Sequence, residues 1–414
     1  MRNRLELAAV TSGHLVNDLY AAFLTPLLPM LVAKFDISLA MAGLLSAVYA
    51  ATSSVVQPVV GHLADTTKSR IFIVLGPTVT ATAMCMIGLA GSEGLLVALL
   101  VIGGIGSGMF HPQGAAMAGS IDQTRKGFIL SVFTTAGEVG YALGPLVVLS
   151  VVSTLGLRYT YVTVVPGILV SLLIYRFAPR RRAVSRAGLS EARRSRPAPA
   201  NDAPANRDGA VTDGARGGKV PVGALVMLWI IAALRLAVSM SYTTFVPIYL
   251  REMGLPLMVY GSVASVFVFA GIIGIMVAGP AADKMGPFKL MVAGLLAPIP
   301  LLLGFMHANG FASYALLAAA GFTIYLPMPI ITMTAQNLAP ARAGTVSAFM
   351  MGVAWGAGSL GAAGIGVLAD ALGIRMALTL LPGALAVAAA FALALESQAH
   401  RAPSLSAAHE PTCQ

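Results

Sequence analysis

Residues Gly43 to Asp65 read GLLSAVYAATSSVVQPVVGHLAD, and Gly261 to Asp283, 218 residues later, read GSVASVFVFAGIIGIMVAGPAAD. Each stretch begins with Gly, continues through mostly apolar residues and ends in Gly-x-x-Ala-Asp. The same offset aligns Pro29 with Pro247. Because about 20 apolar residues suffice to cross a bilayer, the chain contains one membrane-embedded unit twice.

The composition supports a membrane protein. Hydrophobic residues make up 57% of the chain and charged residues 10%, whereas a soluble domain carries about 25% charged residues. The net charge of +10 would suit a nucleic-acid partner, but Lys and Arg are concentrated between the hydrophobic segments. We therefore expect a lipid bilayer around the protein and no nucleic acid.

Twelve hydrophobic segments are long enough to span a membrane, six on each side of a central segment. They cover roughly residues 7–33, 39–64, 71–91, 94–117, 127–153, 158–178, 221–249, 257–282, 288–307, 311–335, 344–369 and 374–395. We predict an N-terminal six-helix bundle (1–178), a disordered basic linker (179–220), a C-terminal six-helix bundle (221–398) and a tail (399–414).

The distribution of Lys and Arg between the spans predicts the orientation. The connections on the side of the termini and the linker hold most of them, and the opposite side holds only Lys34, Arg158, Arg251 and Arg375. By the positive-inside rule, both termini and the linker are cytoplasmic, in a bacterial inner membrane. An even number of spans in each half makes the two halves parallel repeats about an axis normal to the membrane.

Two loop motifs resemble those of the major facilitator superfamily. Gly61-His-Leu-Ala-Asp65, followed by Lys68 and Arg70, resembles the conserved loop between the second and third helices, and Gly279–Gly286 is its degenerate copy. The resemblance implies an all-α integral membrane fold of twelve helices in two halves that work by alternating access. We expect a monomer that acts on a small-molecule substrate.

Further motifs resemble the fosmidomycin-resistance family of efflux proteins. They are Gly13–Asp18, Gln57–Gly61, Phe110–Gly114 and Ala341–Ser347 with the Gly-rich run to Asp370. In the fourth span, Phe110 occupies the position of an Arg common in proton-driven members, and His111 follows it. In the fifth, Gly140–Pro145 resembles the antiporter signature without its usual following Gly pair. The resemblance favours antiport.

The spans contain few ionisable side chains: His14, Asp18, His111, Glu138 and Arg235. A charged side chain at the bilayer centre costs at least about 2.5–3.5 kcal/mol, so each marks a functional pathway by default. His14 and Asp18, four residues apart, share one helical face. Asp18 and Glu138 are candidate proton carriers, and the alternative for each is a hydrogen bond or ion pair between helices.

Arg235 is the main candidate for substrate binding, because a guanidinium stays charged and needs an anionic partner. That partner is Asp18, Glu138 or an anionic group of the substrate. The other polar or aromatic candidates for the cavity are His14, Asn17, His111, Gln113, Tyr20 and Tyr242. For His14 and His111 a structural hydrogen bond is the alternative, and for the tyrosines it is packing.

Charged residues at the helix ends are candidates for gating. Asp65 and Asp283 occupy the repeated loop positions, and Arg70 and Arg125 are possible partners for them. A carboxylate there can dock on a helix N-terminus, where the backbone N–H groups carry partial positive charge. The alternative is ordinary solvation of a loop.

The sequence contains no ATP-binding motif, metal cluster or catalytic triad, and its two cysteines form no disulfide framework. We therefore predict no enzyme, no cofactor and no metal, with the proton gradient as the energy source. The favoured function is proton-driven efflux of a small, potentially anionic, drug or metabolite. The alternatives are a proton-coupled importer and, more distantly, a non-transporting receptor or scaffold.

Overall fold

The computed structural model describes residues 2–67, 69–122, 125–178, 222–339, 346 and 349–401. The predicted linker (179–220), the tail beyond residue 401 and most of the motif at 341–347 lie outside these residues. Within them, twelve helical segments are long and apolar enough to span a membrane, and each coincides with a predicted span. Among the described residues the eleventh begins at Ala354, after a turn of π-helix, Phe349–Val353, and the start predicted at 344 lies outside the described residues.

The first half consists of α1–α7, in which the first span is divided. Its helices are α1 (Arg2–Ala21), α2 (Leu24–Phe35), α3 (Leu39–Thr67), α4 (Ile71–Met86), η1 (Ile87–Leu89), α5 (Glu93–Ile121), α6 (Lys126–Leu155), η2 (Leu157–Val164) and α7 (Val165–Phe177). Helices α1 and α2 together form one span, from Asn3 to Phe35.

The second half consists of α9–α18. Its helices are α9 (Val222–Glu252), α10 (Leu257–Met285), α11 (Pro287–Leu296), α12 (Pro298–Phe305), α13 (Phe311–Tyr325), α14 (Pro327–Leu338), η4 (Phe349–Val353), α16 (Ala354–Leu372), α17 (Ile374–Leu380) and α18 (Gly383–Arg401). Pro298 and Pro327 begin α12 and α14. Since proline lacks the N–H that would continue the helical hydrogen bonding, each interrupts its span.

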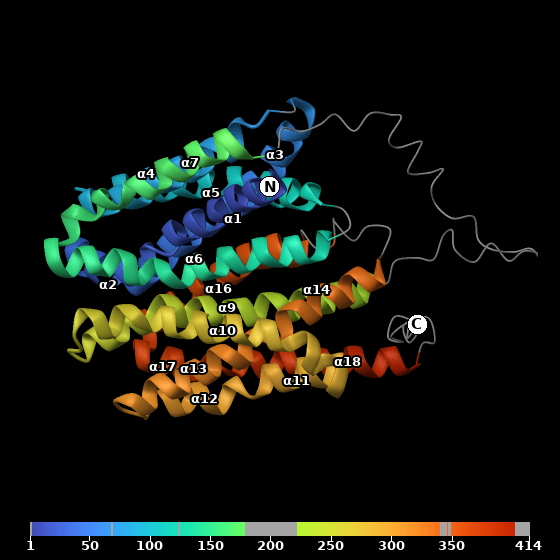
Figure 1. Cartoon of the computed structure of the whole chain (residues 1–414). Helices are drawn as coiled ribbons and strands as arrows, with labels where there is room; N and C mark the ends of the chain where they lie inside the picture. The colour runs from blue at the N-terminus through green and yellow to red at the C-terminus, as the bar shows by residue number, and fades with distance from the viewer. Residues whose placement is uncertain are drawn as a thin grey trace, which may run out of the picture.

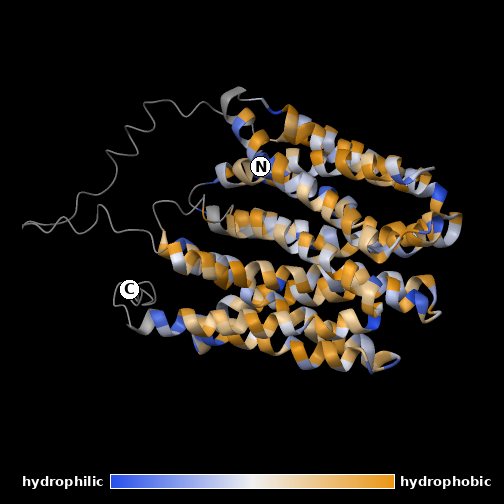
Figure 2. Cartoon of the chain, turned by 180° about the vertical axis from the view of Figure 1, so that it is seen from behind, coloured by the Kyte–Doolittle hydropathy of each residue, from blue (hydrophilic) through white to orange (hydrophobic). Residues whose placement is uncertain are grey.

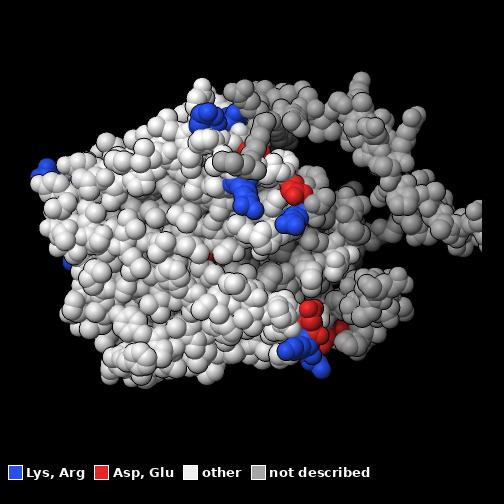
Figure 3. All heavy atoms as spheres, in the orientation of Figure 1, with Lys and Arg blue, Asp and Glu red and all other residues white. Residues whose placement is uncertain are grey.

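The helices form two adjacent bundles, with α1–α7 in one and α9–α18 in the other (Figure 1). Helix α1 begins and α7 ends at the same end of the assembly. The middle of each helix is predominantly hydrophobic (Figure 2), and Lys and Arg gather toward the ends, which leaves a band with few charges between them (Figure 3). This is the distribution expected of a protein that spans a bilayer.

The two bundles meet along equivalent pairs of spans. Helix α3 (the second span) packs against α16 (the eleventh span). Helix α10 (the eighth span) packs against α6 (the fifth span). A Cβ added at Gly43 would lie 2.9 Å from the backbone oxygen of Ala362 in α16, and one at Gly261 would meet the side chain of Leu149 in α6. The glycines that begin the two repeated stretches therefore occupy the same place in two equivalent interfaces, where a missing side chain allows close helix packing.

Candidate functional site

The carboxylate of Asp18 lies between two imidazoles. Nε2 of His14, one turn earlier in α1, is 3.1 Å from Asp18 Oδ2, and Nε2 of His111 in α5 is 3.2 Å from Oδ1. The side chains of His14 and Asp18 are 9% and 17% exposed and that of His111 is 26% exposed. The structure thus joins three of the predicted site residues in one group, which we call the Asp18 triad.

The other ring nitrogen of each imidazole determines where its proton is. Nδ1 of His14 is 2.7 Å from the carbonyl oxygen of Phe133, and Nδ1 of His111 is 2.8 Å from that of Ser107. A carbonyl oxygen only accepts hydrogen bonds, so both Nδ1 atoms carry hydrogen. Since each Nδ1 already carries a hydrogen, the contact between Nε2 and the Asp18 carboxylate is a hydrogen bond only if one additional proton is shared between these two atoms. When both contacts are hydrogen bonds, the triad holds two such protons.

A hydroxyl and amide network surrounds the triad. Asn17 donates to Asp18 Oδ1 at 3.1 Å, and its own amide oxygen accepts from Thr80 in α4 at 3.0 Å. Ser107 in α5 lies within 3.5 Å of the Asn17 amide and accepts from Ser53 in α3 at 3.3 Å. Asn17, one of the predicted site residues, is fully buried and forms a direct hydrogen bond with the Asp18 carboxylate.

Close packing against α6 fixes the position of the triad. The His14 ring stacks on Phe133 with their centroids 4.1 Å apart. A Cβ on Gly137 would lie 2.5 Å from the His14 ring and 2.8 Å from Asp18 Oδ2. A Cβ on Gly140 would overlap the backbone carbonyl of Leu15. Gly137, together with Gly140 of the antiporter-like segment, thus allows α6 to approach α1 closely.

The triad also has the composition of a metal site, since its ligand atoms lie within 4.8 Å of one another. Each imidazole nevertheless faces a different carboxylate oxygen at hydrogen-bond distance. Protons shared between the imidazoles and the carboxylate account for these two contacts without a metal ion. The absence of a metal remains a prediction.

Arg235 and Glu138 form a second charged group, which spans the two halves. Arg235 in α9 is 3% exposed, its guanidinium carbon lies 5.7 Å from the centre of the Tyr325 ring, and Nη1 makes a long contact of 3.5 Å with the Ile324 carbonyl. Glu138 in α6 interacts electrostatically with Arg235 and with Asp18. Among the described residues, no carboxylate lies within 4 Å of the Arg235 guanidinium, and its Nε has no hydrogen-bond partner.

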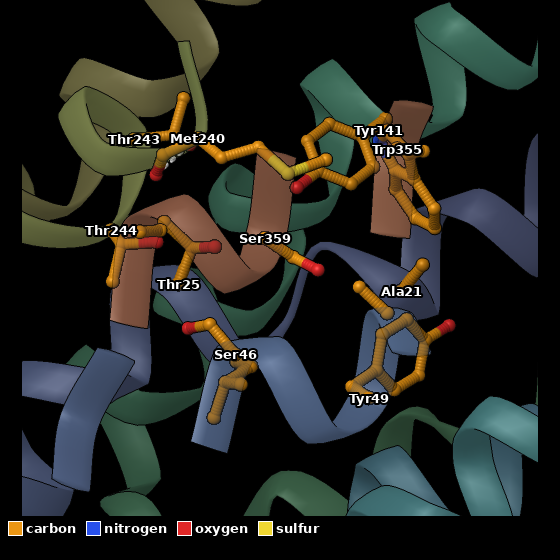
Figure 4. Close-up of a pocket in the computed structure, with 13 residues that line it drawn as sticks. Ala21, Thr25, Ser46, Tyr49, Tyr141, Met240, Thr243, Thr244, Trp355 and Ser359 are labelled. Atoms are coloured by element: carbon orange, nitrogen blue, oxygen red, sulfur yellow. Dashed lines mark hydrogen bonds between the residues drawn. The ribbon is translucent and has the colours of Figure 1, made fainter. Parts of the chain in front are cut away.

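A cavity of about 40 Å³ lies between the two halves. We call it the central cavity. Its walls come from α1, α2, α3 and α6 on one side and from α9 and α16 on the other (Figure 4). The aromatic residues in the wall are Tyr49, Tyr141 and Trp355.

Three residues predicted to line the cavity form hydrogen bonds with backbone groups and lie outside the wall of the central cavity. Gln113 accepts from the Ile73 N–H at 2.9 Å and donates to the Ser69 carbonyl at 2.6 Å, so it joins α5 to the start of α4. The Tyr20 hydroxyl donates to the Thr163 carbonyl, and the Tyr242 hydroxyl donates to that of Leu378 at 2.8 Å. Each tyrosine thereby ties the first helix of its half to the sixth span. The sequence alone does not distinguish a hydrogen bond from these side chains to the backbone from a position in the cavity wall.

The structure describes the gating candidates unequally. The side chain of Asp65 lies outside the described residues. Arg70 donates to the carbonyls of Ile174 and Tyr175, at 3.0 and 3.3 Å, within its own half. Arg125 precedes α6 and is exposed, as is Asp283 near the end of α10. The gating role of these four residues therefore stays a prediction.

Sequence reasoning missed three residues of the site and its surroundings. Tyr49 and Tyr141 line the central cavity, and Asp370 connects the two halves at the end opposite the start of α1. An aromatic residue within a span usually indicates packing, and a single Asp at the end of a helix indicates solvation. The only available signal for Asp370 was its place at the end of the Gly-rich run.

Comparison with known proteins agrees with this architecture. The sequence profile of the Major Facilitator Superfamily matches residues 10–363. The chain belongs to this superfamily. It is 27% identical over 372 residues to the fosmidomycin resistance protein of Escherichia coli (strain K12), covering 89% of this chain and 87% of that protein. It is also 27% identical over 376 residues to YfnC, an uncharacterized transporter of the superfamily from Bacillus subtilis (strain 168), covering 89% and 88%.

Solved structures of the superfamily share the fold. A bacterial homologue of the human lysosomal transporter Spinster, in an inward-facing and occupied conformation, gives a TM-score of 0.78 at 16% identity and covers 98% of both chains. A D-xylose–proton symporter gives 0.70 at 16% identity, covering 95% of this chain and 97% of the other. The predicted fold is confirmed, and the protein is a multi-pass membrane transporter rather than an enzyme.

Proposed function

We propose that this superfamily transporter exports small, polar, anionic solutes from a bacterial cytoplasm in exchange for protons, by alternating access between its two halves. The observation that carries the proposal is the Asp18 triad, a carboxylate held by two imidazoles within the first and fourth spans. Ionisable groups at this depth are costly unless they serve transport. Glu138 interacts electrostatically both with Asp18 and with Arg235 of the second half.

Proton coupling is supported by the hydrogen bonding of the triad. With both Nδ1 atoms donating to backbone carbonyls, removal of one proton leaves an imidazole lone pair facing a carboxylate oxygen. That contact becomes repulsive, and when it is the contact between His111 and Asp18, α5 and α1 are driven apart. Because His14 and Asp18 belong to α1 and His111 to α5, loss of a proton changes the packing of two helices. Proton release and conformational change are thereby linked.

An anionic substrate is supported by Arg235. Its guanidinium is buried, lacks a carboxylate within 4 Å among the described residues, and retains an Nε–H without a partner. A planar guanidinium binds carboxylate and phosphonate groups with two parallel hydrogen bonds. The relation to a fosmidomycin resistance protein favours the same chemistry, since fosmidomycin carries a phosphonate.

The decisive experiment measures proton movement in inside-out membrane vesicles that contain the full chain. An acidic interior is established, fosmidomycin is added outside, and a fluorescent pH indicator follows the interior. An exporter takes substrate into the vesicle and releases protons from it, so the interior becomes less acidic. Asp18→Asn should abolish the response, whereas Glu93→Gln, an exposed position at the start of α5, should preserve it.

The alternative outcomes separate the remaining functions. Further acidification of the interior on addition of substrate would identify a proton-coupled importer. A response to no anionic solute, together with no counterflow in liposomes, would refute transport of this class. Susceptibility of cells that lack or overproduce the protein supplies the range of substrates for the assay.

A further inference from the structure

The Asp18 triad brings several metal-binding atoms close together. Nε2 of His14 lies 3.1 Å from Asp18 Oδ2, and Nε2 of His111 lies 3.2 Å from Oδ1. A ligand nitrogen of each histidine and a carboxylate oxygen all lie within 4.8 Å of one another. Nitrogens on opposite sides of the carboxylate would be farther apart than the two contacts combined. The ring centroids are also only 5.2 Å apart, so the three side chains surround one point.

The spacing and the kinds of ligand suit a zinc ion. Zinc binds imidazole nitrogen at about 2.0–2.1 Å and carboxylate oxygen at about 2.0–2.2 Å, so neighbouring ligands of a tetrahedral ion lie about 3.3 Å apart. The two observed nitrogen–oxygen contacts are close to this distance. Two histidines and a carboxylate leave a fourth position for water. Imidazole favours transition metals, whereas Mg²⁺ and Ca²⁺ prefer sites made of oxygen atoms.

Hydrogen bonds to the backbone already orient both imidazoles for this role. Nδ1 of His14 donates to the Phe133 carbonyl at 2.7 Å, and Nδ1 of His111 donates to the Ser107 carbonyl at 2.8 Å. Histidines that bind metals almost always donate their other ring N–H in this way, which directs the Nε2 lone pair toward the ion. The Asn17 amide also holds the Asp18 carboxylate, at 3.1 Å. The ligands are therefore positioned before an ion arrives.

The triad is enclosed on one side and accessible on another. The His14 ring lies against Phe110 and Phe133, with centroids 5.9 and 4.1 Å away. The His111 side chain, by contrast, is 26% exposed. A hydrated ion can therefore reach the ligands past His111, while the aromatic rings exclude water from the side of His14.

We infer that the Asp18 triad binds a divalent transition-metal ion, with zinc as the best fit, and that the bound ion inhibits transport. The ion accepts lone pairs from Nε2 of both histidines and from the Asp18 carboxylate, and the protons shared at those contacts pass to water. The metal–ligand bonds then fix α1 to α5. The inhibition rests on the proposed proton-coupled transport, but the binding does not. Because the ion acts as an inhibitor and not as a cofactor, transport itself still requires no metal.

Titration of the purified full chain with Zn²⁺, followed by calorimetry, tests the binding. We expect one tightly bound ion per chain and no binding of Mg²⁺ at the same concentrations. Loss of a group that only orients a ligand costs about 10–100-fold in affinity, so loss of a ligand in His111→Gln should weaken binding at least about 100-fold. Equal affinity in His111→Gln and the unchanged protein would overturn the site.

His307 provides a matched control for His111. It is exposed, just beyond α12, and its Nδ1 lies 3.0 Å from the Leu303 carbonyl, four residues earlier. Nδ1 of His111 has the same relation to the Ser107 carbonyl. His307→Ala should therefore preserve the tight binding of Zn²⁺, since only His111 has the other two ligands beside it.

X-ray absorption by zinc bound to the unchanged protein identifies the ligands without a variant. The spectrum should show two imidazole nitrogens at about 2.0–2.1 Å, together with oxygen at about 2.0–2.2 Å. This result is independent of how well His111→Gln folds. A sulfur ligand, or fewer than two imidazoles, would place the ion elsewhere and refute the inference.

The vesicle assay tests the inhibition. Zn²⁺ at ten times its dissociation constant leaves about one site in eleven free, so the proton response to fosmidomycin should fall about tenfold. Mg²⁺ should leave the response unchanged, and His307→Ala should remain sensitive to Zn²⁺. A full response with zinc bound at the triad would refute the inhibition.

The two assays together separate this inference from the proposed function. A normal proton response combined with no tight binding of Zn²⁺ would refute the metal site alone. Tight binding by the triad, combined with no proton response to any anionic solute, would refute proton-coupled export and the inhibition that rests on it, and would leave the metal site in place.

Discussion

Asp370, near the end of α16, accepts a hydrogen bond from the backbone N–H of Leu39, the first residue of α3, at 2.8 Å, although 331 residues separate them. The second carboxylate oxygen accepts from the N–H of Ala40, also at 2.8 Å. A carboxylate from the second half thereby caps a helix of the first half, where the helix dipole favours negative charge. Arg251, near the end of α9, also donates across the halves, to the Pro29 carbonyl in α2. These contacts hold the halves together at the end opposite the start of α1.

Asp370→Asn should weaken this closure, because an amide keeps only one acceptor and no charge. Hydrogen bonds to charged groups contribute about 1.5–3 kcal/mol each, so the outward-open population should rise severalfold or more. A cysteine at Ser46, in a variant without Cys85 and Cys413, should react correspondingly faster with an impermeant thiol reagent added outside. Asp36→Asn, on an exposed residue at the same end, serves as the control. Equal reaction rates in all three proteins would refute the role of Asp370.

Gly137→Ala should disrupt the Asp18 triad without changing any charge. The added methyl group would lie 2.5 Å from the His14 ring and 2.8 Å from Asp18 Oδ2, and overpacking of this kind costs about 1–3 kcal/mol. We expect a lower thermal unfolding midpoint and loss of proton-driven transport. Gly364→Ala, where a Cβ would meet nothing within 4 Å, should behave like the unchanged protein. Normal coupling in Gly137→Ala would show that the triad geometry is not required.

Asp18→Asn should separate substrate exchange from proton coupling. The amide preserves the size and much of the hydrogen bonding of the carboxylate but cannot take up a proton. Accumulation driven by a pH gradient should disappear, and exchange of labelled for unlabelled substrate at equal pH should remain measurable in liposomes. Accumulation at the original rate would move the proton-carrying role to Glu138, for which Glu138→Gln is the corresponding variant.

Arg235→Lys should impair transport of anionic substrates, because an ammonium cannot make the planar, two-pronged contact of a guanidinium. We expect at least a tenfold loss of affinity for fosmidomycin, equivalent to about 1.4 kcal/mol. Neutral substrates, where found, should tolerate Arg235→Gln far better. If Arg235 serves only to neutralise the charge of Glu138, the double variant Arg235→Gln with Glu138→Gln should recover both protein yield and transport. Such recovery would contradict the proposed anion contact.

Much of the fold was predictable because membrane insertion depends on local composition. A run of about 20 apolar residues must become a helix, since no other structure satisfies its backbone in lipid. This fixed the number of spans, their approximate limits and the duplication, including Gly43 and Gly261. The cost of burying charge likewise identified Asp18 and Arg235. The pairing of Asp18 with His14 followed from their spacing of one helical turn.

Contacts between helices were decided only by the tertiary structure. Whether His111 reaches Asp18 depends on how α5 packs against α1, and that packing depends on side-chain shapes along the whole length of both helices. The same packing directs Gln113, Tyr20 and Tyr242 to backbone carbonyls and places Tyr49 in the wall of the central cavity. Asp370 caps α3 because two distant helices converge. Local sequence determined which segments enter the membrane, whereas the complementary surfaces of those segments determined which side chains meet.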